Sequence, residues 1–555
     1  MKYQNFVHIF LTCIVIFFSV SCTKNESEKQ MAIAKLEIDP DKPEPGGTLV
    51  RALSGDPVSL QPLYGYSDGA SCEIIIHLFP PLVRNLEDPD NPGMPVLMPV
   101  LAEKWEFAAN GKELTFKLRE GVFWNDGVEL TTDDVIFTYQ KAIDPTTKTI
   151  VHYAFSRIDT VIAIDKYHFK VYYKEPFIYA VNRWDIGLLP KHILEGRDIN
   201  TDKFNRHPVS YGMFKFHSWT SNEQVVIVAN ETSFWGRPYL DRMIFRIIPE
   251  MAVQVLELKA GNLDLVTRLH TSQFMRDLVG PEVDQKLNKY TFKDNFMYGL
   301  TFNLKNPLFQ DRRVRQAIHY AIDKQSIIDG VQYGMGRPCW GPIPPESWAY
   351  NPDIKKYAFD PQQAQDLLLE AGWRDTNNDG VLDKEGLPFE FTMLSPQNEA
   401  IQQIITIVQQ QLKQVGIRMK IKVVEWSVYL NTFIANRNFD MCVTRGGLGV
   451  LDPDLTFEYH SSQIHDTEYN WATYINPDLD KLIENALKTF DREEQKRCFF
   501  RAQEILAEDL PVIYLFLRDS MFATNKRVQG VKPYPAPLGF DYNLDWWWIP
   551  KALQR

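Results

Sequence analysis

The stretch "AIQQIITIVQQQLKQVGIRMKIKVVEW" (residues 400–426) changes its hydrophobic period at Gly416. Before this glycine, apolar residues recur every three or four positions, as on one face of a helix. They are Ile401, Ile404, Ile405, Val408, Leu412 and Val415. After it, apolar and polar residues alternate, as in a strand with one buried face. A helix that ends at a glycine and leads directly into a strand predicts an α/β architecture.

The second half of the chain continues this pattern. Three further segments contain an Asp or Asn suited to a helix N-cap, at Asp360, Asn476 and Asp491, followed by helix-forming residues. They cover residues 359–373, 476–490 and 491–508. The run "PVIYLFLR" (511–518) is apolar throughout most of its length, which is typical of a strand buried on both faces.

The first half is predicted to be richer in strands. Asn110 and Gly111 separate two alternating runs within residues 105–121, a strong hairpin signal. Thr131 and Asp134 have the spacing of a capping box and predict a helix start. Further strands are expected at residues 46–53, 168–173, 224–230 and 243–248.

Size and charge limit the class of protein. A chain of 555 residues is too long for one hydrophobic core, so two or three domains are expected. The formal charge of −11 makes nucleic acid a poor partner for the folded body. We expect a monomeric globular protein that does not bind nucleic acid.

The N-terminus has the features of an export signal. The apolar run "IFLTCIVIFFSV" (9–20) is too short to span a bilayer and suits a signal-peptide core. Ser21 and Cys22 follow, which resembles the lipidation site of a bacterial lipoprotein. Residues 1–22 are therefore predicted to be a lipoprotein signal with Cys22 lipidated, and the charged, proline-containing residues 23–45 a flexible tether. An ordinary secretory signal and a retained membrane anchor are the alternatives.

Four cysteines lie outside the export segment: Cys72, Cys339, Cys442 and Cys498. No CxxC motif occurs, so a zinc knuckle or a thioredoxin-type site is not expected. Disulfides and free buried thiols both remain open.

Several blocks in order resemble one family. They include "GGTLVRALSGDPVSLQPL" near the start, "FWGRPYLDRMIFRIIPE", "TFNLKNPLFQDRRVRQAIHYAIDKQSII" and "YAFDPQQAQDLLLEAGW". Together they are similar to the bacterial extracellular solute-binding proteins of the peptide/nickel type, family 5, which serve ATP-driven (ABC) importers. The likeness runs from about residue 46 to 548.

The resemblance implies an α/β fold of two lobes, like that of periplasmic binding proteins, with mixed sheets in each lobe and an additional α+β domain. Lobe I would comprise residues 46–80, 205–295 and 515–555. The additional domain would comprise 81–204, and lobe II 296–514. The chain would cross between lobes near 297–304 and 511–518, and the lobes would close on the solute by hinge motion.

The resemblance also implies which residues line the cleft. The segment "TRGGLGVLDPD" (444–454) would form one wall, with Trp426 on a neighbouring turn. Candidate solute-binding residues are Trp426, Arg445, Gly446, Gly447, Gly449, Asp452, Tyr211, Asn303 and Ser395. For Asp452, capping of the loop or of the next helix is the alternative to solute contact.

Two of these positions argue against free dipeptides as the solute. Dipeptide binders of the family carry an acid for the ligand ammonium where this chain has Gly449, and an Arg for the ligand carboxylate near Ser395. A buried charge without its counter-charge costs several kcal/mol. We therefore expect an oligopeptide, with ABC permease subunits as partners and an extracytoplasmic, lipid-anchored location. A nickel chelate or an oligosaccharide is the alternative solute.

No resident cofactor or enzymatic activity is expected. Asp375, Asn377 and Asp379 match the first half of a calcium loop, but Gly386 replaces the bidentate Glu, so a structural turn competes with weak calcium binding. The sequence contains no GxSxG, no GxxxxGK[S/T] and no complete dinucleotide-binding glycine motif. A secreted hydrolase with two distant carboxylates is the alternative of another class.

Overall fold

The computed structural model describes residues 43–555 except 89, 92, 447–451, 466–467, 533–542 and 545. The chain divides into two units, Met1–Lys42 and Pro43–Arg555. The predicted signal, Cys22 and most of the predicted tether lie outside the described residues. None of the helices in the described part has the length and apolar character needed to cross a bilayer.

An 11-stranded sheet runs through the folded unit in the order β17-β16-β18-β12-β19-β11-β1-β10-β9-β8, with β13 paired to β19. Its strands are β1 (Thr48–Leu53), β8 (Phe214–Thr220), β9 (Gln224–Ala229), β10 (Arg242–Ile247), β11 (Leu265–Val266), β12 (Leu287–Phe302), β13 (Gly336–Pro338), β16 (Glu390–Pro396), β17 (Arg418–Val424), β18 (Met441–Gly446) and β19 (Val512–Asn525). Each half contains both parallel and antiparallel pairs, for example β1–β10 and β10–β9 in one and β16–β17 and β12–β18 in the other.

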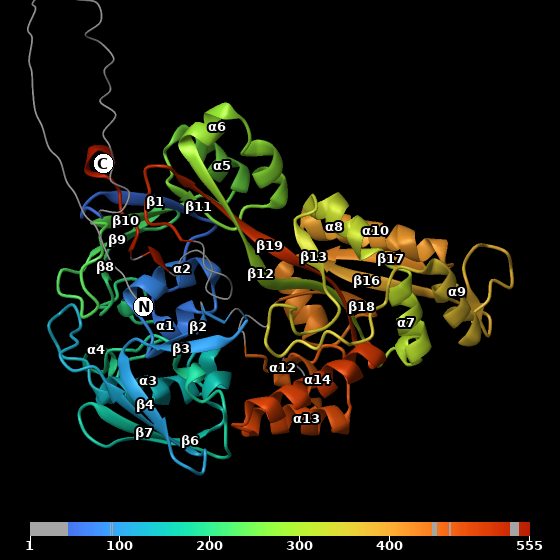
Figure 1. Cartoon of the computed structure of the whole chain (residues 1–555), viewed down its shortest axis with the longest axis horizontal. Coiled ribbons are helices and arrows are strands. Elements are labelled where there is room, and N and C mark those ends of the chain that lie inside the picture. The colour runs from blue at the N-terminus through green and yellow to red at the C-terminus, as the bar shows by residue number, and fades with distance from the viewer. Residues whose placement is uncertain are drawn as a thin grey trace, which may run out of the picture. The chain divides into compact units, whose positions relative to one another are not determined.

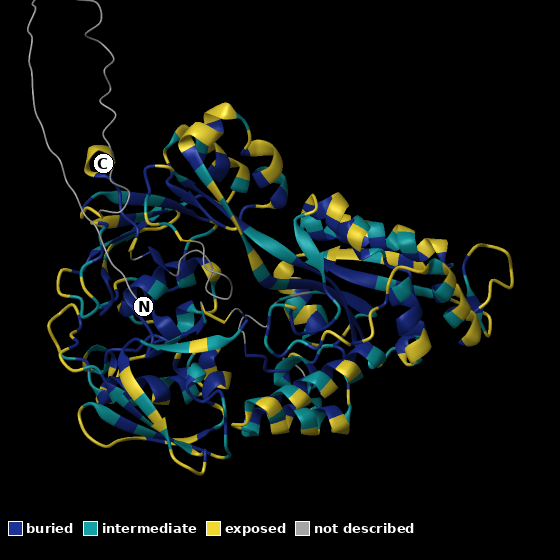
Figure 2. Ribbon diagram, viewed as in Figure 1, coloured by how far each residue is buried: buried dark blue, intermediate teal, exposed yellow. Residues whose placement is uncertain are grey.

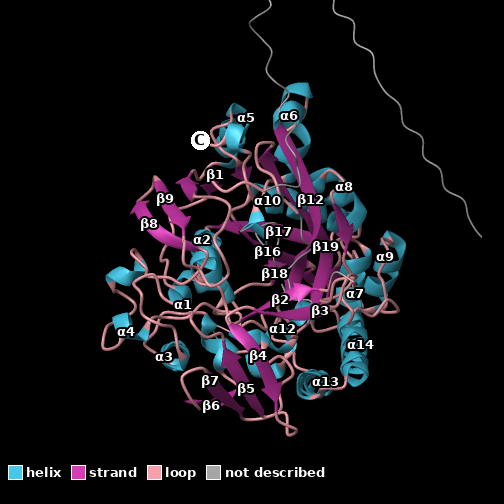
Figure 3. Cartoon of the chain, turned by 60° about the vertical axis from the view of Figure 1, so that its left-hand side comes forward, coloured by secondary structure: helices cyan, strands magenta, loops and turns pink. Residues whose placement is uncertain are grey.

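Two long strands join the halves of this sheet. β12 and β19 lie antiparallel and side by side (Figures 1 and 3), pairing from Leu287↔Asn525 to Thr301↔Val512. The register is irregular between Lys293 and Met297, where the ladder passes from one half to the other. The segments 297–304 and 511–518 overlap these two strands, and the expected lobe crossings there stay a prediction.

The half around β16–β18 matches the expected α/β unit. Asn398 caps α10 (Glu399–Gln414) by accepting from the Ile401 amide, and Gly416 follows the helix with φ +82°. The buried stripe of α10 packs into one core with β16, β18 and α7 (Arg312–Tyr320). The other helices of this region are α8 (Lys324–Gln332) and α9 (Pro361–Glu370), the latter capped by Asp360 as predicted.

The other half carries the predicted strands of the first part of the chain. β1, β9 and β10 lie within two residues of the expected ranges, and α5 (Met251–Ala260) and α6 (Pro281–Lys286) lie near them in sequence. A separate sheet of order β4-β5-β7-β6 contains the predicted hairpin, with Gly111 at φ +65°. Its strands are β4 (Ala102–Phe107), β5 (Glu113–Leu118), β6 (Ile158–Ala163) and β7 (His168–Tyr173). A separate two-stranded sheet, β2 (Val83–Glu87) and β3 (Pro95–Pro99), precedes them in the chain. The capping box of α3 (Thr132–Ile143) is present as predicted.

The helices α13 (Pro477–Lys488) and α14 (Arg492–Asp509) pack against this smaller-sheet region, although they follow β18 in sequence. The Ile178 amide donates to the Leu487 carbonyl at 2.9 Å, and the rings of Phe107 and Phe490 are 5.1 Å apart. Figure 2 shows exposed residues on both helices. The predicted boundaries of lobes and additional domain stay a prediction.

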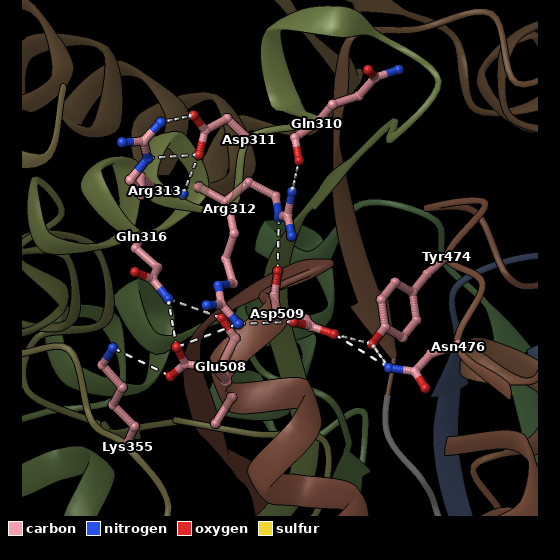
Figure 4. Close-up of polar contacts among 12 residues, drawn as sticks. Gln310, Asp311, Arg312, Arg313, Gln316, Lys355, Tyr474, Asn476, Glu508 and Asp509 are labelled. Carbon is pink, nitrogen blue, oxygen red and sulfur yellow. Dashed lines mark hydrogen bonds and ion pairs between the residues drawn. The ribbon is translucent and has the colours of Figure 1, made fainter. Parts of the chain in front are cut away.

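A polar network fixes the end of α14 against the start of α7 (Figure 4). Arg315 is buried and donates to the carbonyls of Asp509 (2.7 Å), Phe309 (2.6 Å) and Gln310 (3.0 Å). Gln316 donates to the Glu508 carbonyl at 3.0 Å. These contacts satisfy carbonyls at the C-terminus of α14 that have no partner within the helix, and so position the start of β19.

Candidate functional site

A cavity of about 200 Å³ lies beside the point where β12, β18 and β19 run together. It is lined by Met297, Thr301, Thr444, Gly446, Glu458, Tyr459, Tyr469, Trp471, Ala472, Val512 and Tyr514. We call it the strand-crossing cavity. It is smaller than the roughly 300–1,000 Å³ typical of pockets that hold a whole drug-sized ligand. Its size suits one side chain or end group of a longer ligand.

The strand pairing brings the predicted cleft segment to this cavity. β18 pairs antiparallel with β12 so that Gly446 lies opposite Met297. The hydroxyls of Thr301 and Thr444 are hydrogen-bonded across the two strands. The backbone of Arg445 pairs with Tyr298, whereas Gly447 and Gly449 lie outside the described residues.

Aromatic side chains form much of the cavity wall. Tyr459 on α12 (Thr456–Tyr459) and Tyr514 on β19 join their hydroxyls in a buried hydrogen bond. Tyr469 is 55% exposed and therefore lies where the cavity meets solvent. Because ring faces carry negative electrostatic potential, such a wall favours apolar or cationic groups.

The cavity contains one acidic side chain, Glu458. Burial, together with the nearby Asp454 carboxylate, raises the pKa of its carboxyl from 4.5 to about 7. Asp454 itself pairs with Arg183 at 2.6 Å and accepts from the Thr456 amide at 3.1 Å. No ion pair or hydrogen bond engages the Glu458 carboxylate among the side chains that the structure describes.

Asp452 has a structural role in this structure. It is 7% exposed, accepts from the indole nitrogen of Trp348 at 3.2 Å and pairs with Arg492 at 3.0 Å. The Arg492 guanidinium also lies 3.9 Å from the centre of the Trp348 ring. Burial raises the pKa of the Asp452 carboxyl. Asp452 and Asp454 therefore each pair with a different arginine.

Two predicted binding residues are core residues, which corrects the prediction for them. Tyr211 is fully buried; its hydroxyl donates to the Pro80 carbonyl at 2.7 Å and accepts from the Leu188 amide at 3.0 Å. Ser395 is also fully buried and donates to the Pro396 carbonyl at 3.0 Å. Neither hydroxyl faces a solute, because tertiary packing covers both.

Asn303 and Trp426 lie away from the strand-crossing cavity. The Asn303 amide donates to the carbonyls of Arg437 (3.0 Å) and Phe439 (2.7 Å) and lines a separate open groove of about 550 Å³. Trp426 is 41% exposed and stacks on Tyr429, with ring centres 5.6 Å apart. Of the described candidates, only Gly446 lines the strand-crossing cavity.

The sequence reasoning missed Glu458, Tyr459, Tyr469, Trp471 and Tyr514. The stretch "TFEYH" (456–460) contains an acid beside an aromatic residue, which was the available signal. Tyr514 lies in an apolar run that predicts a buried strand, so the sequence gave no signal that this residue lines a cavity.

The predicted calcium loop forms a hydrogen-bonded turn. Asp375 accepts from the amides of Asp379 (3.2 Å) and Gly380 (3.0 Å), and Asn377 accepts from Asp379 at 2.9 Å. Across the described residues, no group of three His, Cys, Asp or Glu side chains is arranged to hold a metal. Calcium binding at this loop stays a prediction. The four cysteines outside the export segment are free thiols.

Comparison with known proteins gives the chain its family. Residues 96–467 match the model of the bacterial extracellular solute-binding proteins, family 5. The chain is 32% identical to the oligopeptide-binding protein AppA of Bacillus subtilis over 98% of both chains. It belongs to family 5 of the bacterial extracellular solute-binding proteins.

Solved structures of the family agree with the fold. The structure of B. subtilis AppA in complex with a nonapeptide has a TM-score of 0.77 at 31% identity, covering 92% of this chain and 100% of that one. NikZ from Campylobacter jejuni in complex with Ni(L-His) has a TM-score of 0.78 at 27% identity, covering 90% and 99%. The predicted family and its two-lobed α/β fold are confirmed, and the family is one of solute-binding proteins.

Proposed function

We propose that this protein captures an oligopeptide outside the cytoplasm by lobe closure and delivers it to the permease subunits of an ABC importer. It acts as a monomer without catalysing a reaction, and is anchored to the membrane through lipid on Cys22. The observation that carries the proposal is the 32% identity to an oligopeptide-binding protein over 98% of both chains.

The site geometry supports a ligand longer than a dipeptide. The strand-crossing cavity holds about 200 Å³, too little for a whole peptide, and Tyr469 leaves it partly open to solvent. A longer peptide can place one group in the cavity and meet its remaining polar groups with main-chain hydrogen bonds. Its polar backbone needs no dedicated counter-charge at Gly449 or Ser395.

Specific polar contacts between two parts of the chain can stabilise a closed form. Arg183–Asp454 (2.6 Å) and Glu175–Lys488 (2.9 Å) join the predicted additional domain to predicted lobe II. Gln495 also donates to the Tyr179 hydroxyl at 3.1 Å. These contacts are available only when the two parts meet, so a solute that touches both parts would stabilise them.

Native mass spectrometry of protein purified without refolding tests the proposal. We expect a series of added masses that correspond to peptides of three or more residues and disappear after unfolding and refolding. A retained sugar or metal chelate as the sole bound species, or hydrolysis of added peptides, would contradict it. Membrane-fraction protein should carry acyl chains on Cys22, and Cys22→Ala should abolish them.

A further inference from the structure

The strand-crossing cavity presents one ionisable acid without a counter-ion. Glu458 lies on α12 and lines the cavity, and no described side chain forms an ion pair with it. Asp454, the nearby acid, is already paired with Arg183 at 2.6 Å. A carboxylate enclosed by apolar and aromatic groups is costly to ionise unless a cation joins it.

The walls around this acid fit a cation. Tyr459, Tyr469, Trp471 and Tyr514 contribute rings to the same cavity as Glu458. Aromatic faces and a carboxylate both attract an ammonium or guanidinium, and the methylene groups of a basic side chain pack on rings. A single acidic group among several aromatic rings is therefore complementary to a group that is apolar along its length and positive at its end.

We propose that the strand-crossing cavity is a subsite for a positively charged group of the bound peptide, and that the Glu458 carboxylate pairs with it. This subsite rests on the proposed function and determines which peptides the protein prefers. The group is an organic ammonium or guanidinium, from either a basic side chain or the peptide N-terminus. Glu458 thus supplies the negative charge for the ligand cation, which dipeptide binders of the family carry at the position of Gly449.

The ionisation of Glu458 responds to a bound cation. The pKa of Glu458 is about 7 because of burial and of Asp454. A bound cation favours the ionised form and lowers this pKa, so binding releases a proton below neutral pH. The other ionisable groups near the cavity are Asp454, Arg183, Tyr459, Tyr469 and Tyr514. Asp454 is paired with Arg183, and burial raises the pKa of Tyr459 well above its usual value.

Calorimetry with matched peptides tests the subsite. The probes are alanine pentapeptides with one lysine or one isosteric norleucine at each position in turn, each with a free or an acetylated N-terminus. We expect at least a tenfold preference for lysine at one position, or a similar loss on acetylation. The first result assigns the group to a side chain and the second to the N-terminus.

The variant Glu458→Gln isolates the carboxylate. It should reduce the preference to within about twofold, and its circular dichroism spectrum and cooperative unfolding show that the variant is folded. Glu504→Gln, on the exposed side of α14, is the matched control and should keep the preference. For the parent protein, the preference should fall about tenfold between pH 8 and pH 5.5 as Glu458 takes up a proton.

The outcomes separate this inference from the proposed function. Peptides that bind with no preference for a cation, or a preference that survives Glu458→Gln, would refute the subsite and leave peptide binding intact. If no peptide of any composition binds the refolded protein, while it folds normally, the proposed function itself fails.

Discussion

Replacing Glu458 by Gln should stabilise the peptide-free protein at alkaline pH. The folded-state pKa of about 7 exceeds the value of 4.5 for an exposed glutamate, so the folded state binds the proton more tightly. The free energy of unfolding therefore falls as pH rises from about 4.5 to about 7, and stays low above that range. Glutamine is neutral throughout and removes this cost.

The magnitude follows from the same pKa. At about 1.4 kcal/mol per pKa unit, the full effect is about 3 kcal/mol. Glu458 is only partly covered, so solvent screening reduces the expected gain to about 1.5–2 kcal/mol at pH 8. At pH 4.5 the parent carboxyl is mostly protonated, and the two proteins should be nearly equally stable.

Urea unfolding followed by tryptophan fluorescence measures this difference. The protein must first be unfolded and refolded to remove retained peptide, because a bound ligand stabilises the folded state by mass action. Glu504→Gln serves as the control and should not change the pH profile. A Glu458→Gln variant that is no more stable than the parent at pH 8, or equally stabilised at pH 4.5, would refute the account of a buried, uncompensated acid.

Two further substitutions test the contacts that hold the fold and the closed form. Arg183→Ala removes the partner of Asp454 and should weaken peptide binding at least tenfold, with a larger radius of gyration in small-angle scattering of the peptide-loaded protein; Arg197→Ala, in a surface pair, should leave both unchanged. Arg315→Met leaves three carbonyls without a donor and should lower the free energy of unfolding by about 3–5 kcal/mol in denaturant titrations, whereas the exposed Arg313→Met should have no measurable effect. Unaltered behaviour of Arg183→Ala or Arg315→Met would show that these contacts carry little of the free energy assigned to them.

Local signals in the sequence predicted the elements well. Asp360 and Thr131 each cap a helix at the expected place because capping depends on residues only two or three positions away. The hairpin at Gly111 follows for the same reason, since its turn needs a positive φ that glycine adopts without strain. The order of the family-like blocks along the chain led to the family without any spatial information.

The candidate site was predicted less well. Tyr211 and Ser395 were assigned to the cleft by their place in the chain, yet packing buries both. Trp426 and Asn303 do not line the cavity that Gly446 lines. Residues that a family resemblance assigns to one cleft need not line the same pocket in the folded chain. Burial and pocket lining depend on which elements pack together, and single-residue patterns do not record this.

The sequence by itself determined the helices, the strands, the export signal as an expectation and the family, because each depends on neighbouring residues or on their order. Only the tertiary structure decided the roles of the acids in "LDPDLTFEYH" (451–460). Arg492 neutralises Asp452, and Arg183, 271 positions before Asp454, neutralises that residue. Glu458 has no such partner among the described side chains and faces a cavity built from several strands and loops. The physical reason is that an acid's charge state and role depend on the groups that surround it in space, whereas its place in the chain fixes only its nearest neighbours.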